Sequence, residues 1–195
     1  MYVRDAKNRE EVWLLDRIEE MGLDDTAFRS RDYVVAIDEV SNEKAGFGRI
    51  RIHTGDDHEG ACELTSIGVL EGWRGQGVGA HVVERLVEYA GDHGFERVYA
   101  LTSEGAYLAQ FGFRSIDPDE LPAPLQTRLE EKRERTDPDA KPLRIAVDGF
   151  EMPRRLREAF KRASETTQSG SGDDATPEEF GIDPETATYK YDTGR

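Results

Sequence analysis

The stretch Glu63–Leu86, ELTSIGVLEGWRGQGVGAHVVERL, decides the fold of this protein. It begins as a predicted β-strand and runs through the glycine-rich turn RGQGVG into an amphipathic helix. The first amides of a helix have no internal acceptor and lie at the positive end of its macrodipole. Glycine at positions 75, 77 and 79 permits positive φ angles and close approach of the backbone to a ligand. The turn therefore predicts an anion site that suits a phosphate.

Two common phosphate-binding patterns do not fit this turn. A Walker A loop needs GxxxxGK[ST], and no lysine follows these glycines. A dinucleotide fingerprint needs GxGxxG near the start of a βαβ unit, whereas Ala80 holds the third glycine position and several predicted strands precede the turn. The pattern that fits is Q/R-x-x-G-x-G/A after a strand, and the residues that match it are Ile67, Gly68, Val69, Arg74, Gly77 and Gly79.

The segments around the turn predict an α/β (α+β) domain. Before it, segments 33–40, 45–54 and 61–69 are predicted antiparallel strands joined by short turns. After it come a helix over 78–91 and a strand over 97–102, which we expect to pair parallel to 61–69 because a helix connects them. The expected fold is a mixed sheet with an antiparallel meander, a central parallel strand pair and flanking helices. The other predicted elements are strands over 2–4, 113–116 and 142–147 and helices over 104–110, within 125–139 and over 154–164.

A further helix is predicted near the amino terminus. Asn8 is its expected N-cap, and Gly22 is its expected end. Helical spacing predicts a core face made of Val12, Leu15 and Ile18, which Met21 can extend and which Trp13 and Leu14 widen.

The combined pattern resembles the GNAT superfamily of acetyl-CoA-dependent N-acetyltransferases, in which a meander, the turn, the helix and a later segment like YLAQFGF (107–113) follow in this order. The resemblance covers about residues 1–150, and segment 101–122 is similar to the amino-acid N-acetyltransferase branch, which includes N-acetylglutamate synthase domains. It implies an enzyme, an acyltransferase that moves acetyl from acetyl-CoA to the amine of a small molecule such as an amino acid. A protein N-terminal acetyltransferase and a non-catalytic CoA-binding module remain the alternatives.

By this resemblance, the amides of residues 75–80 hold the pyrophosphate of acetyl-CoA without a metal. The strand Ile67–Val69 pairs with the pantetheine arm, and an amide near Val69 faces the thioester oxygen. The implied cofactor-binding residues are Ile67, Gly68, Val69, Arg74, Gly75, Gln76, Gly77, Val78, Gly79, Ala80 and Ser103.

Glu63 and Tyr107 are the candidate catalytic residues. An alkylammonium group titrates at about 10.4, so a base must remove a proton, and many family members carry a carboxylate at the position of Glu63 that works through water. The alternative for Glu63 is a solvent-facing strand residue. Family members often place a tyrosine, which protonates the leaving thiolate, at the position of Leu108. Tyr107 stands one residue earlier, about 100° around a helix, so packing is its alternative role and Ser103 is a second candidate donor.

Substrate specificity is expected from the helix after Asn8 and from segments 27–33 and 118–124. Arginines are the candidate partners of a substrate carboxylate because the guanidinium group binds it bidentately. The candidates are Arg29, Arg31 and Arg51, each with ordinary surface charge as the alternative.

The composition excludes several classes of protein. With 41 acidic against 26 basic residues, the net charge of -15 argues against a nucleic-acid or anionic-membrane partner. No apolar run approaches the ~20 residues that span a bilayer, so we expect a soluble, cytoplasmic protein. The acid-rich, lysine-poor composition is similar to that of proteins from salt-loving archaea, and an acidic mesophilic protein is the alternative.

The sequence gives little support to a metal site. The single cysteine, Cys62, lies in an apolar stretch and is expected to be a small buried side chain rather than a nucleophile. The four histidines form no HExxH or similar pair. We therefore expect no metal.

The chain is predicted to contain one domain and a tail. Residues 1–165 form the expected acetyltransferase domain, with its core over 1–150, and residues 166–195 form an expected disordered acidic tail that cannot bury enough apolar surface to fold alone. A homodimer and a protein partner for the tail are the associations left open. The tail residues spaced like docking residues are Phe180, Ile182, Tyr189 and Tyr191.

Overall fold

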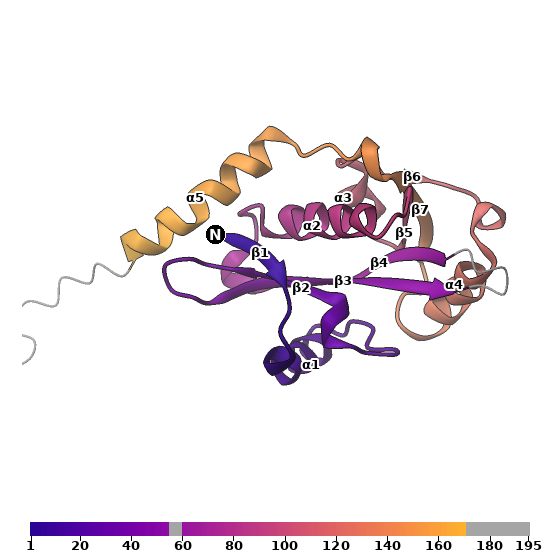
Figure 1. Ribbon diagram of the computed structural model, residues 1–195, viewed down its shortest axis with the longest axis horizontal. Coiled ribbons are helices and arrows are strands. Elements are labelled where there is room, and N and C mark those ends of the chain that lie inside the picture. Colours follow the sequence, from indigo (N-terminus) through magenta and orange to yellow (C-terminus); the bar gives the residue numbers. More distant parts are fainter. Residues whose placement is uncertain (55–59, 171–195) are drawn as a thin grey trace, which may run out of the picture.

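The structure is a computed structural model that describes residues 1–54 and 60–170. Within this part of the chain, seven strands form one sheet in the order β1-β2-β3-β4-β5-β7-β6 (Figure 1). Strands β4 and β5 pair in parallel, and every other neighbouring pair is antiparallel, which confirms the predicted meander and central parallel pair. The strands are β1 (Tyr2–Asp5), β2 (Tyr33–Ile37), β3 (Lys44–Thr54), β4 (Gly60–Val69), β5 (Arg97–Thr102), β6 (Arg114–Ser115) and β7 (Lys141–Ala146).

Helices cover both faces of the sheet (Figure 1). Alternation along β2 separates the two faces, because Val34 and Ala36 belong to the core cluster under α2, whereas Tyr33 and Val35 pack against α1. Helix α4 covers the β5 part of the α1 face. The helices are α1 (Glu11–Glu20), α2 (Val78–Asp92), α3 (Gly105–Ala109), α4 (Ala123–Arg135) and α5 (Arg154–Gly170).

Helix α2 lies directly against the sheet, as its apolar spacing predicts. Val82 and Leu86 are fully buried. A Cβ at Gly48 of β3 would come within 2.5 Å of the Val82 side chain and 2.9 Å of the Leu86 side chain. Glycine at position 48 therefore allows the close contact between β3 and α2.

The predicted core face of α1 was partly wrong. Leu14 and Ile18 are buried, but Val12 is 70% exposed and Leu15 is 37% exposed. A 3-10 turn over Asn8–Glu10 precedes the helix, which begins only at Glu11. The face that packs on the sheet is therefore set by Leu14 and Ile18, four residues apart on one side of the helix.

Helix α5 packs beside the amino end of α2 (Figure 1). The ring of Phe160 stacks on His81 of α2 with 3.7 Å between the ring centroids. Helix α5 continues to Gly170, beyond its predicted end at residue 164. The rest of the predicted acidic tail, with its four expected docking residues, lies outside the described residues, so the domain boundary and the tail's role stay predictions.

Candidate active site

Strands β4 and β5 separate beyond a short parallel pairing, which leaves an opening in the sheet. Their last paired residues are Leu64 and Ala100, although β4 continues to Val69 and β5 continues to Thr102. The register of β4 against β3 shifts in this region, and Ser66 has a φ angle of 49°. This bulge adds one residue to β4 and redirects the strand away from β5.

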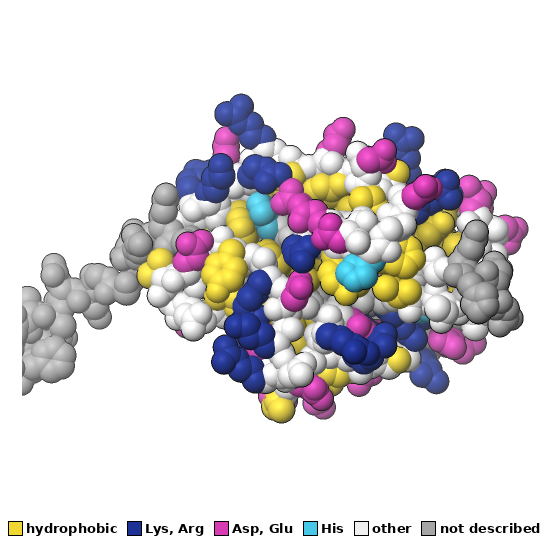
Figure 2. Space-filling view, viewed as in Figure 1, with side chains coloured by type: hydrophobic (Ala, Val, Ile, Leu, Met, Phe, Trp, Pro, Cys, Tyr) yellow, Lys and Arg dark blue, Asp and Glu magenta, His cyan; other side chains and the backbone are white. Residues whose placement is uncertain are grey.

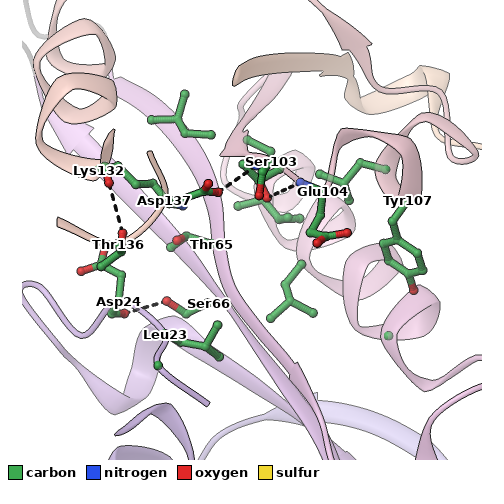
Figure 3. Close-up of a pocket in the computed structure, with 18 of the residues that line it drawn as sticks. Leu23, Asp24, Thr65, Ser66, Ser103, Glu104, Tyr107, Lys132, Thr136 and Asp137 are labelled. Carbon is green, nitrogen blue, oxygen red and sulfur yellow. Dashed lines mark hydrogen bonds between the residues drawn. The ribbon is translucent and has the colours of Figure 1, made fainter. Parts of the chain in front are cut away.

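A cavity of about 540 Å³ occupies the opening. Its walls come from the loop after α1, from β4, from the end of β5 with α3, and from the end of α4 with the loop that follows. Figure 3 shows Lys132 and Thr136 on one side of this cavity and Glu104 and Tyr107 on the other, with Asp137 and Ser103 joined by a hydrogen bond between them.

A second cavity, of about 1040 Å³, lies along the glycine-rich turn. It shares Val69, Gly79 and Tyr107 with the first cavity. The two cavities therefore meet between the end of β4 and the first turn of α2. A ligand held at the turn can reach the opening between the strands from this junction.

The backbone amides of the turn are available to a ligand. Gly77 precedes the first residue of α2 with a φ angle of 76°, and Gly75 has a φ angle of 75°. Among the described residues, we find no backbone acceptor for the amides of residues 75–80. Free amides at the amino end of a 15-residue helix fit the pyrophosphate of a coenzyme.

Most of the residues expected to bind the cofactor lie at these cavities. Gln76 and Ala80 line neither cavity. The side-chain amide of Gln76 donates to the backbone carbonyl of Gly72 over 2.9 Å, and Ala80 is buried in the core. Only the backbone amides of these two residues can therefore serve the site. The residues that line one or both cavities are Ile67, Gly68, Val69, Arg74, Gly75, Gly77, Val78, Gly79 and Ser103.

Tyr107 borders both cavities. Its hydroxyl lies 2.8 Å from the position that a Cβ would occupy at Gly79, so it sits at the first turn of α2. Burial raises the pKa of the phenol, although Arg155 opposes the shift. Leu108, the position at which family members often carry a tyrosine, is buried in the core. The one-residue offset therefore leaves Tyr107 within reach of the junction.

Glu63 lies beneath the first cavity rather than at its wall. It is fully buried, which rules out the solvent-facing alternative. Its Oε2 lies 2.7 Å from His53 Nε2 and 3.4 Å from Arg128 Nε, and Arg128 also pairs with Asp24. Its Oε1 is buried and has no partner in the described part of the chain, so it can accept a hydrogen bond from a water molecule.

Sequence analysis missed the contribution of α4 to this site. Arg128 reaches Glu63, and Lys132, one turn further on, borders the cavity. Leu125 and Leu129 are buried on the same side of the helix. The spacing of these four residues is the signal that would have placed both cations on the buried face.

The expected specificity segments are only partly supported. Segment 118–124 lies near the start of β4 and lines a different cavity. Arg29 pairs with Asp32 over 3.0 Å, and neither Arg29, Arg31 nor Arg51 borders the first cavity. The loop after α1 and the end of α4 form the wall in their place, because α4 packs over β5.

Cys62 is a structural residue, as predicted. Its side chain is buried, and burial raises the pKa of its thiol to about 12. In the described ranges, no group of three or more His, Cys, Asp or Glu side chains could hold a metal ion. None of the helices in those ranges has the length and apolar character to cross a membrane.

A mixed sheet that opens at a bulged strand, next to a glycine-rich turn at a helix amino end, is an arrangement that suits a CoA-dependent acyltransferase. The model of the acetyltransferase (GNAT) family matches residues 2–113. The chain belongs to this family, which confirms the resemblance, the fold and the acyltransferase class inferred from the sequence.

Several solved structures share the fold. N-acetylglutamate synthase from Neisseria gonorrhoeae, complexed with coenzyme A and N-acetyl-glutamate, matches with a TM-score of 0.59 and 19% identity over 74% of this chain and 34% of that one. This chain therefore spans about a third of the synthase. Rv2747 from Mycobacterium tuberculosis, in complex with CoA and NLQ, matches with a TM-score of 0.62 and 17% identity over 75% of this chain and 99% of that one. A GNAT acetyltransferase from Staphylococcus aureus Mu50 matches with a TM-score of 0.53 and 13% identity over 74% and 98%.

Proposed function

We propose that the protein binds acetyl-CoA and transfers its acetyl group to the amine of a small molecule, with amino acids as the leading class of acceptor. The observation that carries this proposal is the junction of the two cavities. One cavity follows the free amides of residues 75–80, and the other fills the opening between β4 and β5. Coenzyme and acceptor can therefore approach each other at Val69, Gly79 and Tyr107.

Different parts of the site are proposed to bind different parts of the coenzyme. Acetyl-CoA, when bound, supplies the thioester. The amides of the turn hold its pyrophosphate, and the free edge of Ile67–Val69 pairs with its pantetheine arm. An amide near Val69 donates to the thioester oxygen as negative charge develops there.

Two side chains are proposed to move protons. Glu63 takes the proton of the acceptor amine through water at its unpartnered Oε1, because the carboxylate itself does not border the cavity. Tyr107 donates a proton to the departing thiolate, and Ser103, whose amide donates to Asp137 over 2.8 Å, is the second candidate donor.

A small acceptor is favoured over a peptide by the size of the acceptor cavity. A volume of about 540 Å³ suits a small molecule. The ligands named for the Neisseria gonorrhoeae complex, coenzyme A and N-acetyl-glutamate, also agree with an amino-acid acceptor. A protein N-terminus is the second candidate, and a non-catalytic CoA-binding module is the third.

Release of coenzyme A over a panel of amino acids, polyamines and amino-terminal peptides tests the proposal. We expect turnover with at least one free amine at a higher kcat/KM than with any peptide. Calorimetric titration of coenzyme A and acetyl-CoA separates binding from catalysis. Binding without turnover would favour the non-catalytic module, and absence of binding in both low and molar salt would overturn the proposal.

Further expectations from the sequence remain proposals. These are a cytoplasmic location, a reaction without a metal, and a role for the acidic tail in binding a protein partner. We propose none of the site residues as a metal ligand.

Stability is expected to rise with salt concentration. The chain carries a net charge of -15, although acidic and basic side chains are interspersed on the face shown in Figure 2. Molar salt shortens the screening length to ~3 Å, which weakens repulsion among the acidic groups. The thermal midpoint should therefore rise with KCl and level off near molar concentrations, whereas sucrose of equal osmolality should give a smaller rise. A thermal midpoint that does not change with KCl concentration would contradict the halophilic interpretation.

A further inference from the structure

Lys132 brings a positive charge to the acceptor cavity and forms no direct ion pair with a carboxylate in the described part of the chain. Its side chain is half-buried in the last turns of α4 and borders the cavity (Figure 3). Burial lowers the pKa of the ammonium group, and the charge of Arg128 adds to this shift, whereas the charges of Glu63 and Asp137 oppose it. In the described part of the chain, no carboxylate pairs with it directly. A cation taken out of water without a partner is costly, and an anionic ligand would offset that cost.

The carboxylates of this region are engaged elsewhere. Asp24 pairs with Arg128, which also lies 3.4 Å from Glu63. Asp137 accepts the backbone amide of Ser103 over 2.8 Å. The lysine is therefore the cation of this cluster that a ligand can reach from the cavity.

Thr65 supplies a second unsatisfied group at the same cavity. Its Oγ1 is buried and has no partner among the described residues. Thr65 borders the cavity, and Figure 3 shows it between the wall that carries Lys132 and the wall that carries Ser103. A hydroxyl can donate to an anion, so the ammonium and the hydroxyl together make a site for one carboxylate.

We propose that Lys132, assisted by Thr65, binds a carboxylate of the acceptor, so that the preferred acceptors are amines that also carry a carboxylate. This inference rests on the proposed function and names the substrate class of the same site. The acceptor's amine then points to the opening between β4 and β5, where Glu104 on the opposite wall contributes negative charge. Specificity comes from α4, not from Arg29, Arg31 or Arg51.

Matched acceptors test the proposal. For the best amino acid of the panel, kcat and KM are measured alongside its carboxamide and its decarboxylated amine. We expect the carboxylate form to have a kcat/KM at least about tenfold above that of the other two. A preference for either uncharged form would overturn the carboxylate site while leaving acetyl transfer intact.

Variants then assign the effect to Lys132. Lys132→Met should raise KM for the amino acid about 10- to 100-fold and leave kcat/KM for the carboxamide within about twofold. Lys132→Arg should recover part of the discrimination, because it keeps the charge. Lys161→Met, which removes an exposed lysine of α5, is the matched control. It should change neither the KM for the amino acid nor the kcat/KM for the carboxamide.

The outcomes separate the two levels of the proposal. If Lys132→Met lowered kcat/KM equally for all three acceptors and Lys132→Arg restored none of it, the proposed carboxylate site would be wrong. Lys132 would then be a structural residue. Absence of turnover with every amine would overturn the proposed function itself. Titration of the N-acetylated amino acid into the CoA-bound protein adds a measurement without turnover. An unchanged affinity for this ligand in Lys132→Met would also contradict the proposed carboxylate site.

Discussion

Replacing Glu63 with glutamine is expected to lower kcat for acetyl transfer by about 10²- to 10⁴-fold while the KM for acetyl-CoA changes little. Glutamine has nearly the same shape and can still hydrogen-bond to His53 and Arg128, but it cannot take a proton. The deficit should shrink as the pH approaches the pKa of the acceptor amine, about 10.4 for an alkylamine, because a growing fraction of the acceptor is then already neutral. Steady-state rates across this pH range measure both effects.

Glu10→Gln is the matched control for this experiment. Glu10 is also a buried carboxylate, paired with Arg4 over 2.8 Å, but it lies at the amino end of α1 and borders neither cavity. It should lower the thermal midpoint and leave kcat within about twofold. If Glu63→Gln behaved in the same way, Glu63 would be a structural member of the ion cluster and the assignment of the base would be wrong.

Gly77→Ala is expected to cause the largest loss of stability and of coenzyme binding in the turn. Gly77 has a φ angle of 76°, and a Cβ there would lie 2.3 Å from the carbonyl oxygen of Leu156 in α5. Because that atom belongs to the backbone, no side-chain rotation relieves the clash. We expect the free energy of unfolding to fall by about 2–5 kcal/mol, the sum of left-handed strain and overpacking. Affinity for coenzyme A should fall more than tenfold because the turn must move.

Gly75→Ala isolates the contribution of α5. Gly75 has nearly the same φ angle, 75°, but apart from its immediate chain neighbours no atom of residues 1–54 and 60–170 lies within 4 Å of the position of its Cβ. Only the left-handed strain remains, so the free energy of unfolding should fall by about 1–2 kcal/mol. Denaturant titration of both variants gives the comparison. Equal losses would mean that α5 does not support the turn.

The contrast between α2 and α1 shows how far local patterns reach. The strand, glycine-rich turn and α2 follow from the sequence because apolar periodicity and glycine at sharp turns are properties of neighbouring residues. The face of α1 did not follow, because several apolar residues spread around the helix and only packing against the sheet selected Leu14 and Ile18.

The candidate site divides in the same way. Its coenzyme half, from Ile67 to Ala80, lies in one continuous segment whose chemistry can be inferred without a structure. Its acceptor half joins distant segments, since Arg128 is 65 residues from Glu63 and 104 residues from Asp24 along the chain. Charge alone does not predict which residues pair, because the chain has 41 acidic and 26 basic side chains.

By itself, the sequence determined the family, the order of the elements and the glycine-rich turn that we propose as the coenzyme site, because each is encoded by residues close together in the chain. Only the tertiary structure decided that Glu63 is sealed beneath the cavity, that Lys132 reaches into it and that Leu156 closes over Gly77. Those contacts depend on how α4 and α5 pack against the sheet and α2, and packing between remote segments leaves no local pattern.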